Sequence, residues 1–221
     1  MSRIRLVLAT AVAFAIAPAF AGQDIDKING SITAEASQTY GDLETVNGSI
    51  RVEANARIEN AETVNGSIHA ADNVQAQSLS TVNGSIRVGT QAQIDGGVET
   101  VNGSVFVDRG SRIARNVETV NGAIGLVDSD LGGGIETVNG DITVGAGSHV
   151  QGGIHVEKPG TQWIQIGKRK PPRIVIGANA QVDGPLVFER EVTLYVHRTA
   201  KIGKVSGATA VRYDGDRAPK D

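Results

Sequence analysis

The chain has 221 residues and a formal net charge of −3 at pH 7, from 21 lysines and arginines against 24 aspartates and glutamates. It contains no cysteine, which excludes a disulfide framework and thiolate chemistry. The mildly acidic balance argues against nucleic acid as a partner, because nucleic-acid-binding proteins usually carry a basic face.

Residues 1–21 have the pattern of a secretory signal peptide. Arg3 and Arg5 precede the apolar run LVLATAVAFAIA, and AFA supplies small residues for cleavage between Ala21 and Gly22. A transmembrane helix is the weaker interpretation, because the apolar run is shorter than the roughly 20 residues that span a bilayer. The sequence therefore predicts an exported protein, periplasmic or extracellular, with no transmembrane segment after cleavage.

A short phrase recurs through the next predicted segment, residues 22–157, and it predicts a solenoid. The phrase ETVNGSI lies at 44–50 and 62–68, and degenerate copies of it lie at 80–86, 99–105, 118–124 and 136–142. With a partial copy at 28–32, the asparagines recur at intervals of 18, 18, 18, 19, 19 and 18 residues. Repeats of this length indicate coils that bury their apolar faces only against their neighbours.

Each repeat divides into three blocks of about six residues, as in VNGSIR, VEANAR and IENAET from Val46 onward. Three short sides per turn predict a triangular coil. Within the blocks, SIRV and SVFV place apolar residues two apart, which is the period of a β-strand. We therefore predict an all-β fold, a single-stranded parallel β-helix with about 18 residues per coil and a core of short aliphatic side chains.

The Asn-Gly pair of each repeat is interpreted as a corner of the triangle. A corner requires a positive φ, which Gly adopts freely and Asn tolerates, and stacked Asn amides can hydrogen-bond in a ladder. Leu43 and Val46 lie three residues apart, so a bend or bulge is expected between them, and it stays open whether Thr45 or Val46 faces the core. The predicted corner ladder, preferred over a ligand-binding row, is Asn29, Asn47, Asn65, Asn83, Asn102, Asn121 and Asn139.

The Glu that opens the phrase forms a second column, which Ser80 interrupts: Glu44, Glu62, Glu99, Glu118 and Glu136. Carboxylates stacked about 4.8 Å apart repel one another by about 1 kcal/mol per pair in water. The preferred interpretation is a solvated row that prevents lateral aggregation, and the alternative is a weak candidate site for cations such as Ca²⁺. The adjoining threonines suggest an ice-binding hydroxyl array, which the charged neighbouring row disfavours.

No catalytic constellation is recognisable, and neither a cofactor nor a firm metal site is predicted. The four histidines, His69, His149, His155 and His197, lack metal-ligand spacing, and no nucleophile elbow or phosphate-binding loop is present. Enzymes on parallel β-helices wall their clefts with long inserted loops, whereas six successive intervals here vary by one residue. The chain is therefore expected not to be an enzyme.

Regularity ends after Val156. Residues 158–205 are predicted to form irregular C-terminal coils that cap the rod, with a protruding loop at Pro171-Pro172, because proline cannot donate ladder hydrogen bonds. Residues 206–221 are polar and predicted to be disordered. The loop is either a solvated connection or a contact patch for an acidic partner, formed by Trp163, Lys168, Arg169, Lys170 and Arg173.

These repeats resemble two groups of bacterial β-solenoids. The phrase VNGSIRV is similar to the repeats of a secreted adhesin family, and blocks such as VGTQAQIDGGV (88–98) and IGANAQVDGPL (176–186) resemble bactofilins, the polymer-forming cytoskeletal proteins. Both resemblances imply a right-handed triangular β-helix without a cofactor, and bactofilins further imply filaments formed by end-to-end stacking. Bactofilins typically lack an export signal, so the secreted family fits better.

The expected function is that of a non-catalytic, exported structural or adhesin-like β-solenoid of the bacterial cell envelope. The alternative is a bactofilin-like scaffold filament that assembles itself, and a polysaccharide-active β-helix enzyme is the third hypothesis. The expected partners are further copies of the chain, stacked end to end, or polysaccharide and lipid of the cell envelope.

Overall fold

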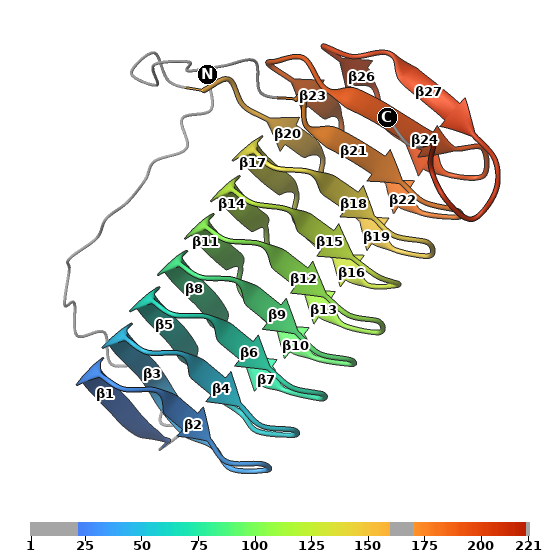
Figure 1. Cartoon of the computed structure of the whole chain (residues 1–221). Helices are drawn as coiled ribbons and strands as arrows, with labels where there is room; N and C mark the ends of the chain where they lie inside the picture. The colour runs from blue at the N-terminus through green and yellow to red at the C-terminus, as the bar shows by residue number, and fades with distance from the viewer. Residues whose placement is uncertain (1–21, 160–169, 220–221) are drawn as a thin grey trace.

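The structure is a computed structural model that describes residues 22–159 and 170–219. The chain winds through about ten coils, from β1 at one end to β26 and β27 at the other (Figure 1). Every regular element in the described part is a strand, and the strands form three parallel sheets around one aliphatic core. The predicted all-β solenoid, with about 18 residues per coil, is confirmed. The predicted signal peptide, Trp163, Lys168 and Arg169 lie outside the described residues.

Sheet A contains the ETVN strands and extends along the whole rod. Successive strands pair in parallel, each with the equivalent residues of the next coil. Its strands are, in spatial order, β1 (Gln23–Asn29), β3 (Tyr40–Asn47), β5 (Asn60–Asn65), β8 (Ser78–Asn83), β11 (Val98–Asn102), β14 (Val117–Asn121), β17 (Ile135–Asn139), β20 (Ile154–Val156), β23 (Leu186–Phe188) and β26 (Val205–Ser206).

Sheet B follows the Asn-Gly corner and contains the Ile-x-Val strands. Its first and third residues are buried and the second faces outward, as the alternation predicts. Its strands are β2 (Ile32–Ala34), β4 (Ile50–Val52), β6 (Ile68–Ala70), β9 (Ile86–Val88), β12 (Val105–Val107), β15 (Ile124–Leu126), β18 (Ile142–Val144), β21 (Arg173–Ile176), β24 (Thr193–His197) and β27 (Ala210–Tyr213).

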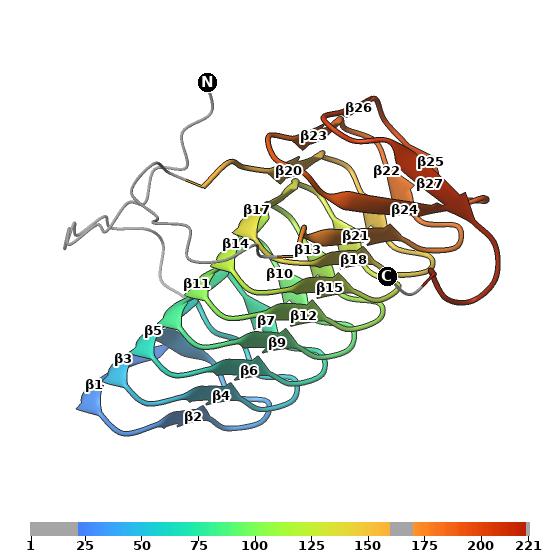
Figure 2. The same ribbon diagram turned by 45° about the horizontal axis from the view of Figure 1, so that its top comes forward.

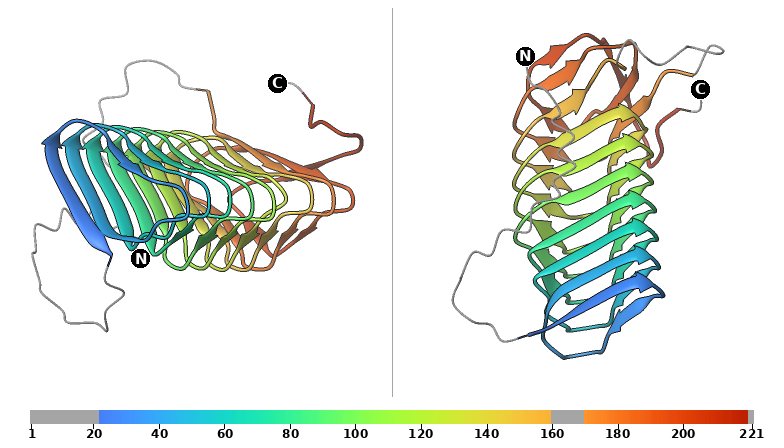
Figure 3. Two further views of the ribbon diagram at one scale, coloured as in Figure 1. Left: turned by 90° about the horizontal axis from the view of Figure 1, so that it is seen from below. Right: turned by 90° about the vertical axis from the view of Figure 1, so that its left-hand side faces the viewer.

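Sheet C closes the triangle with strands of two residues each. Isolated bridges of Arg57 to Thr39 and to Gln75 continue the same pairing into the first coils. The stacked coils and their three sides are visible in the two views of Figure 3. The strands are β7 (Gln75–Ala76), β10 (Gln93–Ile94), β13 (Arg112–Ile113), β16 (Asp130–Leu131), β19 (His149–Val150), β22 (Gln181–Val182) and β25 (Lys201–Ile202).

In sheet A the Thr of the phrase faces the core and the Val faces outward, which settles the question that the sequence left open. The side chains of Leu43 and Thr45 are 0% and 4% exposed, whereas that of Val46 is 41% exposed. Plain alternation therefore places Leu43 and Thr45 inside, and the bend or bulge predicted between Leu43 and Val46 is wrong. The buried hydroxyl is satisfied, since Thr45 Oγ1 donates to the Gly30 carbonyl of the preceding coil over 3.1 Å.

The Asn-Gly corner is tight because successive coils approach closely, and the predicted positive φ at Asn is wrong. No asparagine of the ladder has a positive φ. A Cβ on Gly48, Gly66, Gly84, Gly103, Gly122 or Gly140 would lie only 1.8–2.2 Å from the carbonyl oxygen of the preceding coil's glycine. Glycine is therefore required at this corner mainly by the space between coils, and only Gly30 and Gly122 of the corner glycines also have a positive φ.

The left-handed backbone lies at a different corner, between sheets B and C. There one residue in each of eight successive coils has a φ between 44° and 77°. This column contains residues of several types: Ser37, Asn55, Asn73, Gln91, Gly110, Asp128, Gly147 and Asn179. Because the residue type varies, the sequence shows no obvious signal at this corner.

The coil stack continues past the irregular segment without losing register. Ile142 of β18 pairs with Ile174 of β21, 32 residues later, in place of the usual 18 or 19. The predicted disorder from residue 206 onward is corrected for 206–213, which include β27 paired with β24 (Figure 2). Tyr213 is 9% exposed, and its hydroxyl donates to the Ile176 carbonyl over 3.3 Å. This buried aromatic ring and the strand pairing stabilise a segment whose polar composition suggested disorder.

Candidate functional site

The predicted asparagines form one continuous hydrogen-bonded ladder along the corner between sheets A and B. Each Asn Nδ2 donates to the Oδ1 of the asparagine one coil earlier, over 3.0 or 3.1 Å, from Asn139 back to Asn29. At the C-terminal end, Arg190 Nη1 donates to Asn139 Oδ1 and to the Val138 carbonyl. The side-chain amides of the ladder therefore hydrogen-bond to one another and hold adjacent coils together.

The five predicted glutamates lie in one row on the outer face of sheet A. Register pairs link Glu44 to Glu62 and link Glu99, Glu118 and Glu136 in sequence, with Ser80 between the two groups. The row extends beyond the sequence prediction at both ends, because Asp26 pairs with Glu44 and His155 pairs with Glu136. The result is a strip of negative charge along one side of the rod.

Partial burial, and then the charges of neighbouring carboxylates, raise the pKa of three carboxyl groups in this row. For Glu44 the main cause is desolvation, followed by the charges of Asp26 and Glu62. Desolvation comes first for Glu99 as well, and Glu118 adds repulsion. The pKa of Glu136 is raised by desolvation and by Glu118, and His155 partly offsets this increase. Ionising the row therefore works against the folded state.

An aliphatic row accompanies the glutamates on the same face, two residues further along each strand. Ile28 is 73% exposed, Val46 41% and Val64 37%, the largest values in this row. Because Thr45 and its equivalents point inward, the outer face shows carboxylates and methyl groups side by side and no flat hydroxyl array. The prediction that the threonines present a hydroxyl array on the surface is therefore wrong.

Sheet B carries the opposite charge over its N-terminal half. Arg51, His69 and Arg87 lie in register on its outer face, and the guanidinium of Arg87 sits 4.6 Å from the ring centroid of Phe106 in the next coil. Desolvation, and then the charges of Arg51 and Arg87, lower the pKa of His69. Two neighbouring sides of the rod thus differ in charge.

Of the predicted contact patch, the structure describes Lys170 and Arg173. Both line a groove of about 740 Å³ beside the C-terminal segment, together with Tyr213 and Arg217. Arg173 also has a structural role, because its Nη2 donates to the Pro219 carbonyl over 2.6 Å and its guanidinium lies 4.9 Å from the Tyr195 ring centroid. The basic run and the C-terminal segment therefore meet in one groove.

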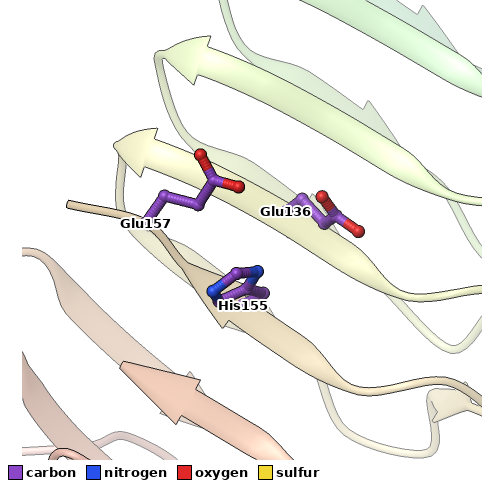
Figure 4. Close-up of side chains that lie close together, drawn as sticks. All are labelled: Glu136, His155 and Glu157. Atoms are coloured by element: carbon purple, nitrogen blue, oxygen red, sulfur yellow. The ribbon is translucent and has the colours of Figure 1, made fainter. Parts of the chain in front are cut away.

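Three groups at the end of the acidic row could hold a metal ion. Glu136, His155 and Glu157 each place one ligand atom within 4.8 Å of the others, the one such group found among residues 22–159 and 170–219 (Figure 4). The remaining members of the predicted glutamate row are not brought together in this way. Sequence reasoning missed His155 and Glu157, although His155 follows Glu136 by one coil length of 19 residues.

No family model, curated protein or solved structure matches this chain. In the part of the chain that the structure describes, no helix is long and apolar enough to span a membrane.

Proposed function

We propose that the protein is a non-catalytic, exported structural rod of the bacterial cell envelope, adhesin-like in that one surface contacts an envelope component. The observation that carries the proposal is the continuity of its sheets, two of which run through ten strands with like side chains in register. Such a stack is stiff, because each coil is hydrogen-bonded to its neighbours along its sides.

The contact surface proposed for an acidic envelope polymer or lipid is the groove beside the C-terminal segment. Lys170, Arg173 and Arg217 line it and supply positive charge, next to one acidic residue, Asp216. The basic residues Lys168 and Arg169 immediately precede Lys170 in the sequence. Export is supported by the signal-peptide pattern of residues 1–21.

Sedimentation with purified cell envelopes tests this proposal. The chain should pellet with the envelopes, and the triple variant Lys168→Glu, Arg169→Glu, Lys170→Glu should stay largely in the supernatant. Arg173 is left unchanged because it packs on Tyr195 and bonds to Pro219. The matched control is Arg57→Glu, Arg112→Glu, Arg115→Glu, an equal charge change at exposed positions elsewhere. If both variants pellet equally, the groove is not the contact surface. If the parent chain does not pellet, the protein has no adhesive role.

A self-assembling scaffold filament is the second candidate function. It is favoured by the edge of sheet A at β1, whose single strand partner among the described residues is β3. Unpaired strand edges invite further stacking. Negative-stain microscopy and small-angle scattering at rising concentration distinguish the two functions. Separate rods would support the structural-rod function, and their coil stack should be about 45 Å long because strands lie about 4.8 Å apart. Long fibres of constant width would support the filament function.

A further inference from the structure

The strand register brings a histidine and two carboxylates together where the chain leaves sheet A. Glu136 of β17 and His155 of β20 are register partners, so they stand side by side on adjacent coils. Glu157 follows His155 by two residues and therefore projects from the same face. All three are half-buried and lie near one another on the same face (Figure 4), with one ligand atom of each within 4.8 Å of the others.

A fourth residue orients the imidazole. His155 Nε2 lies 3.2 Å from Glu189 Oε1, and the other carboxylate oxygen of Glu189 accepts a hydrogen bond from the Lys158 backbone N–H over 3.4 Å. When Nε2 carries the proton and donates it to Glu189, Nδ1 keeps its lone pair. In Figure 4 the second ring nitrogen faces Glu136 and Glu157. A carboxylate that holds one nitrogen while the other faces ligand oxygens is the usual arrangement around a metal-bound histidine.

We propose that Glu136, His155 and Glu157 bind one first-row divalent transition-metal ion, with Zn²⁺ the best fit. One imidazole nitrogen and two carboxylate oxygens suit such an ion, whereas Ca²⁺ and Mg²⁺ prefer ligand sets made only of oxygen. Open coordination positions would be filled by water. The site is distinct from the rod function proposed above, and neither depends on the other.

The bound ion has a structural role at this position. It joins β17 to β20 through side chains, in addition to the backbone pairing of the two strands. It also fixes Glu157, the residue after β20, at the start of the segment that separates β20 from β21. The ion thus fastens the coil stack at the one place in the described chain where a coil has a long connection.

Isothermal titration calorimetry of the untagged, chelator-treated chain with ZnCl₂ tests the site. We expect binding of one equivalent and an increase in melting temperature, with no comparable heat from CaCl₂ or MgCl₂. One equivalent of Co²⁺ should give visible absorption bands that Zn²⁺ abolishes. The variant His155→Gln should bind Zn²⁺ at least tenfold more weakly and lose the Co²⁺ bands.

His149→Gln is the matched control, because His149 Nε2 likewise pairs with a carboxylate of the next coil, Asp183 Oδ2, over 2.8 Å. It should keep full metal affinity. Glu136→Gln removes one ligand and leaves the His155–Glu189 contact intact, so its loss of affinity cannot be attributed to that contact. Circular dichroism checks that each variant is folded. The proposal is overturned if the parent binds no stoichiometric Zn²⁺, or if His155→Gln and Glu136→Gln bind as tightly as His149→Gln.

Discussion

At the residue scale, the two halves of the Asn-Gly pair have separate functions. Asn builds a ladder of side-chain hydrogen bonds, and Gly allows the backbone of one coil to approach the next. The position of this corner was predictable because both residues recur with the coil period. The reason for the glycine was not, since a close approach between coils depends on the stacking distance and not on local turn preference. Likewise, the left-handed corner escaped detection because residues as different as Ser37, Gln91 and Asp128 occupy it.

The close approach predicts that alanine is poorly tolerated at the corner glycines. In Gly84→Ala the new Cβ would lie 1.9 Å from the Gly66 carbonyl oxygen, and the backbone would have to move. We expect a loss of about 3 kcal/mol in the free energy of unfolding, measured by urea denaturation. Gly125→Ala is the control, because its Cβ would meet the Phe106 ring at an ordinary 3.4 Å. Equal effects of the two substitutions would contradict the steric explanation.

At the element scale, the outer face of sheet A shows how far periodicity can predict a site. The glutamate row was predictable, because identical residues recur in one position of the repeat. The spacing between the histidines did not indicate a ligand role for His155, because its neighbours in space are glutamates one coil before it and two residues after it. Which of Thr45 and Val46 faces inward was also not predictable, since both are β-branched and lie in adjacent positions. The bond from Thr45 to the Gly30 carbonyl, 3.1 Å long, makes the buried hydroxyl acceptable.

The acidic row predicts a pH-dependent gain of stability in Glu99→Gln. The unfolded carboxyl titrates near its ordinary pKa of 4.5, and in the folded chain desolvation and Glu118 raise the pKa. The folded state is therefore penalised above the raised pKa, and the penalty disappears as the pH falls toward 4.5. At pH 7.5 and low salt, Glu99→Gln should melt higher by an amount worth up to about 1 kcal/mol.

The melting temperatures of Glu99→Gln and the parent should converge below pH 4.5, where the Glu99 carboxyl of the parent is protonated in both the folded and the unfolded chain. Added salt should reduce the difference at pH 7.5, because it screens exposed charges. Ser80→Glu gives the opposite test, since it closes the gap in the row between Glu62 and Glu99. Ser80→Glu should lower the melting temperature at pH 7.5. If the higher melting temperature of Glu99→Gln persists unchanged at acidic pH, the electrostatic explanation is refuted.

At the scale of the whole molecule, the coil stack and its period followed from the sequence, whereas the extent of the stack did not. The repeated phrase ends near Asn139, yet sheets A and B continue through β23, β24, β26 and β27. Those last strands use bulkier residues such as Phe188 and Tyr195 and no longer carry the phrase. Tertiary pairing with the preceding coil selects a strand conformation for Ala210–Tyr213 that local composition did not indicate.

We predict that the last strand, β27, limits self-association. Deleting residues 209–221 removes β27, so the edge of β24 loses its backbone partner and the ring contact between His197 and Tyr213. We expect larger species at rising concentration in size-exclusion chromatography with light scattering, because exposed strand edges pair with one another. Deleting only residues 216–221 keeps β27 and should leave the mass distribution of the full chain. A 209–221 deletion that is indistinguishable from the full chain would show that β27 does not protect this edge.

The asparagine ladder also gives the rod an electrical direction. All its amide groups are oriented alike, with N–H pointing toward β1 and the carbonyl oxygen pointing toward the last coils. Aligned amides polarise one another and concentrate partial negative charge at the carbonyl end of the row. The Arg190 cation sits at that end, on Asn139 Oδ1, as a cationic side chain does at the C-terminus of a helix. The two ends of the molecule therefore differ in potential even though the coils between them are nearly identical.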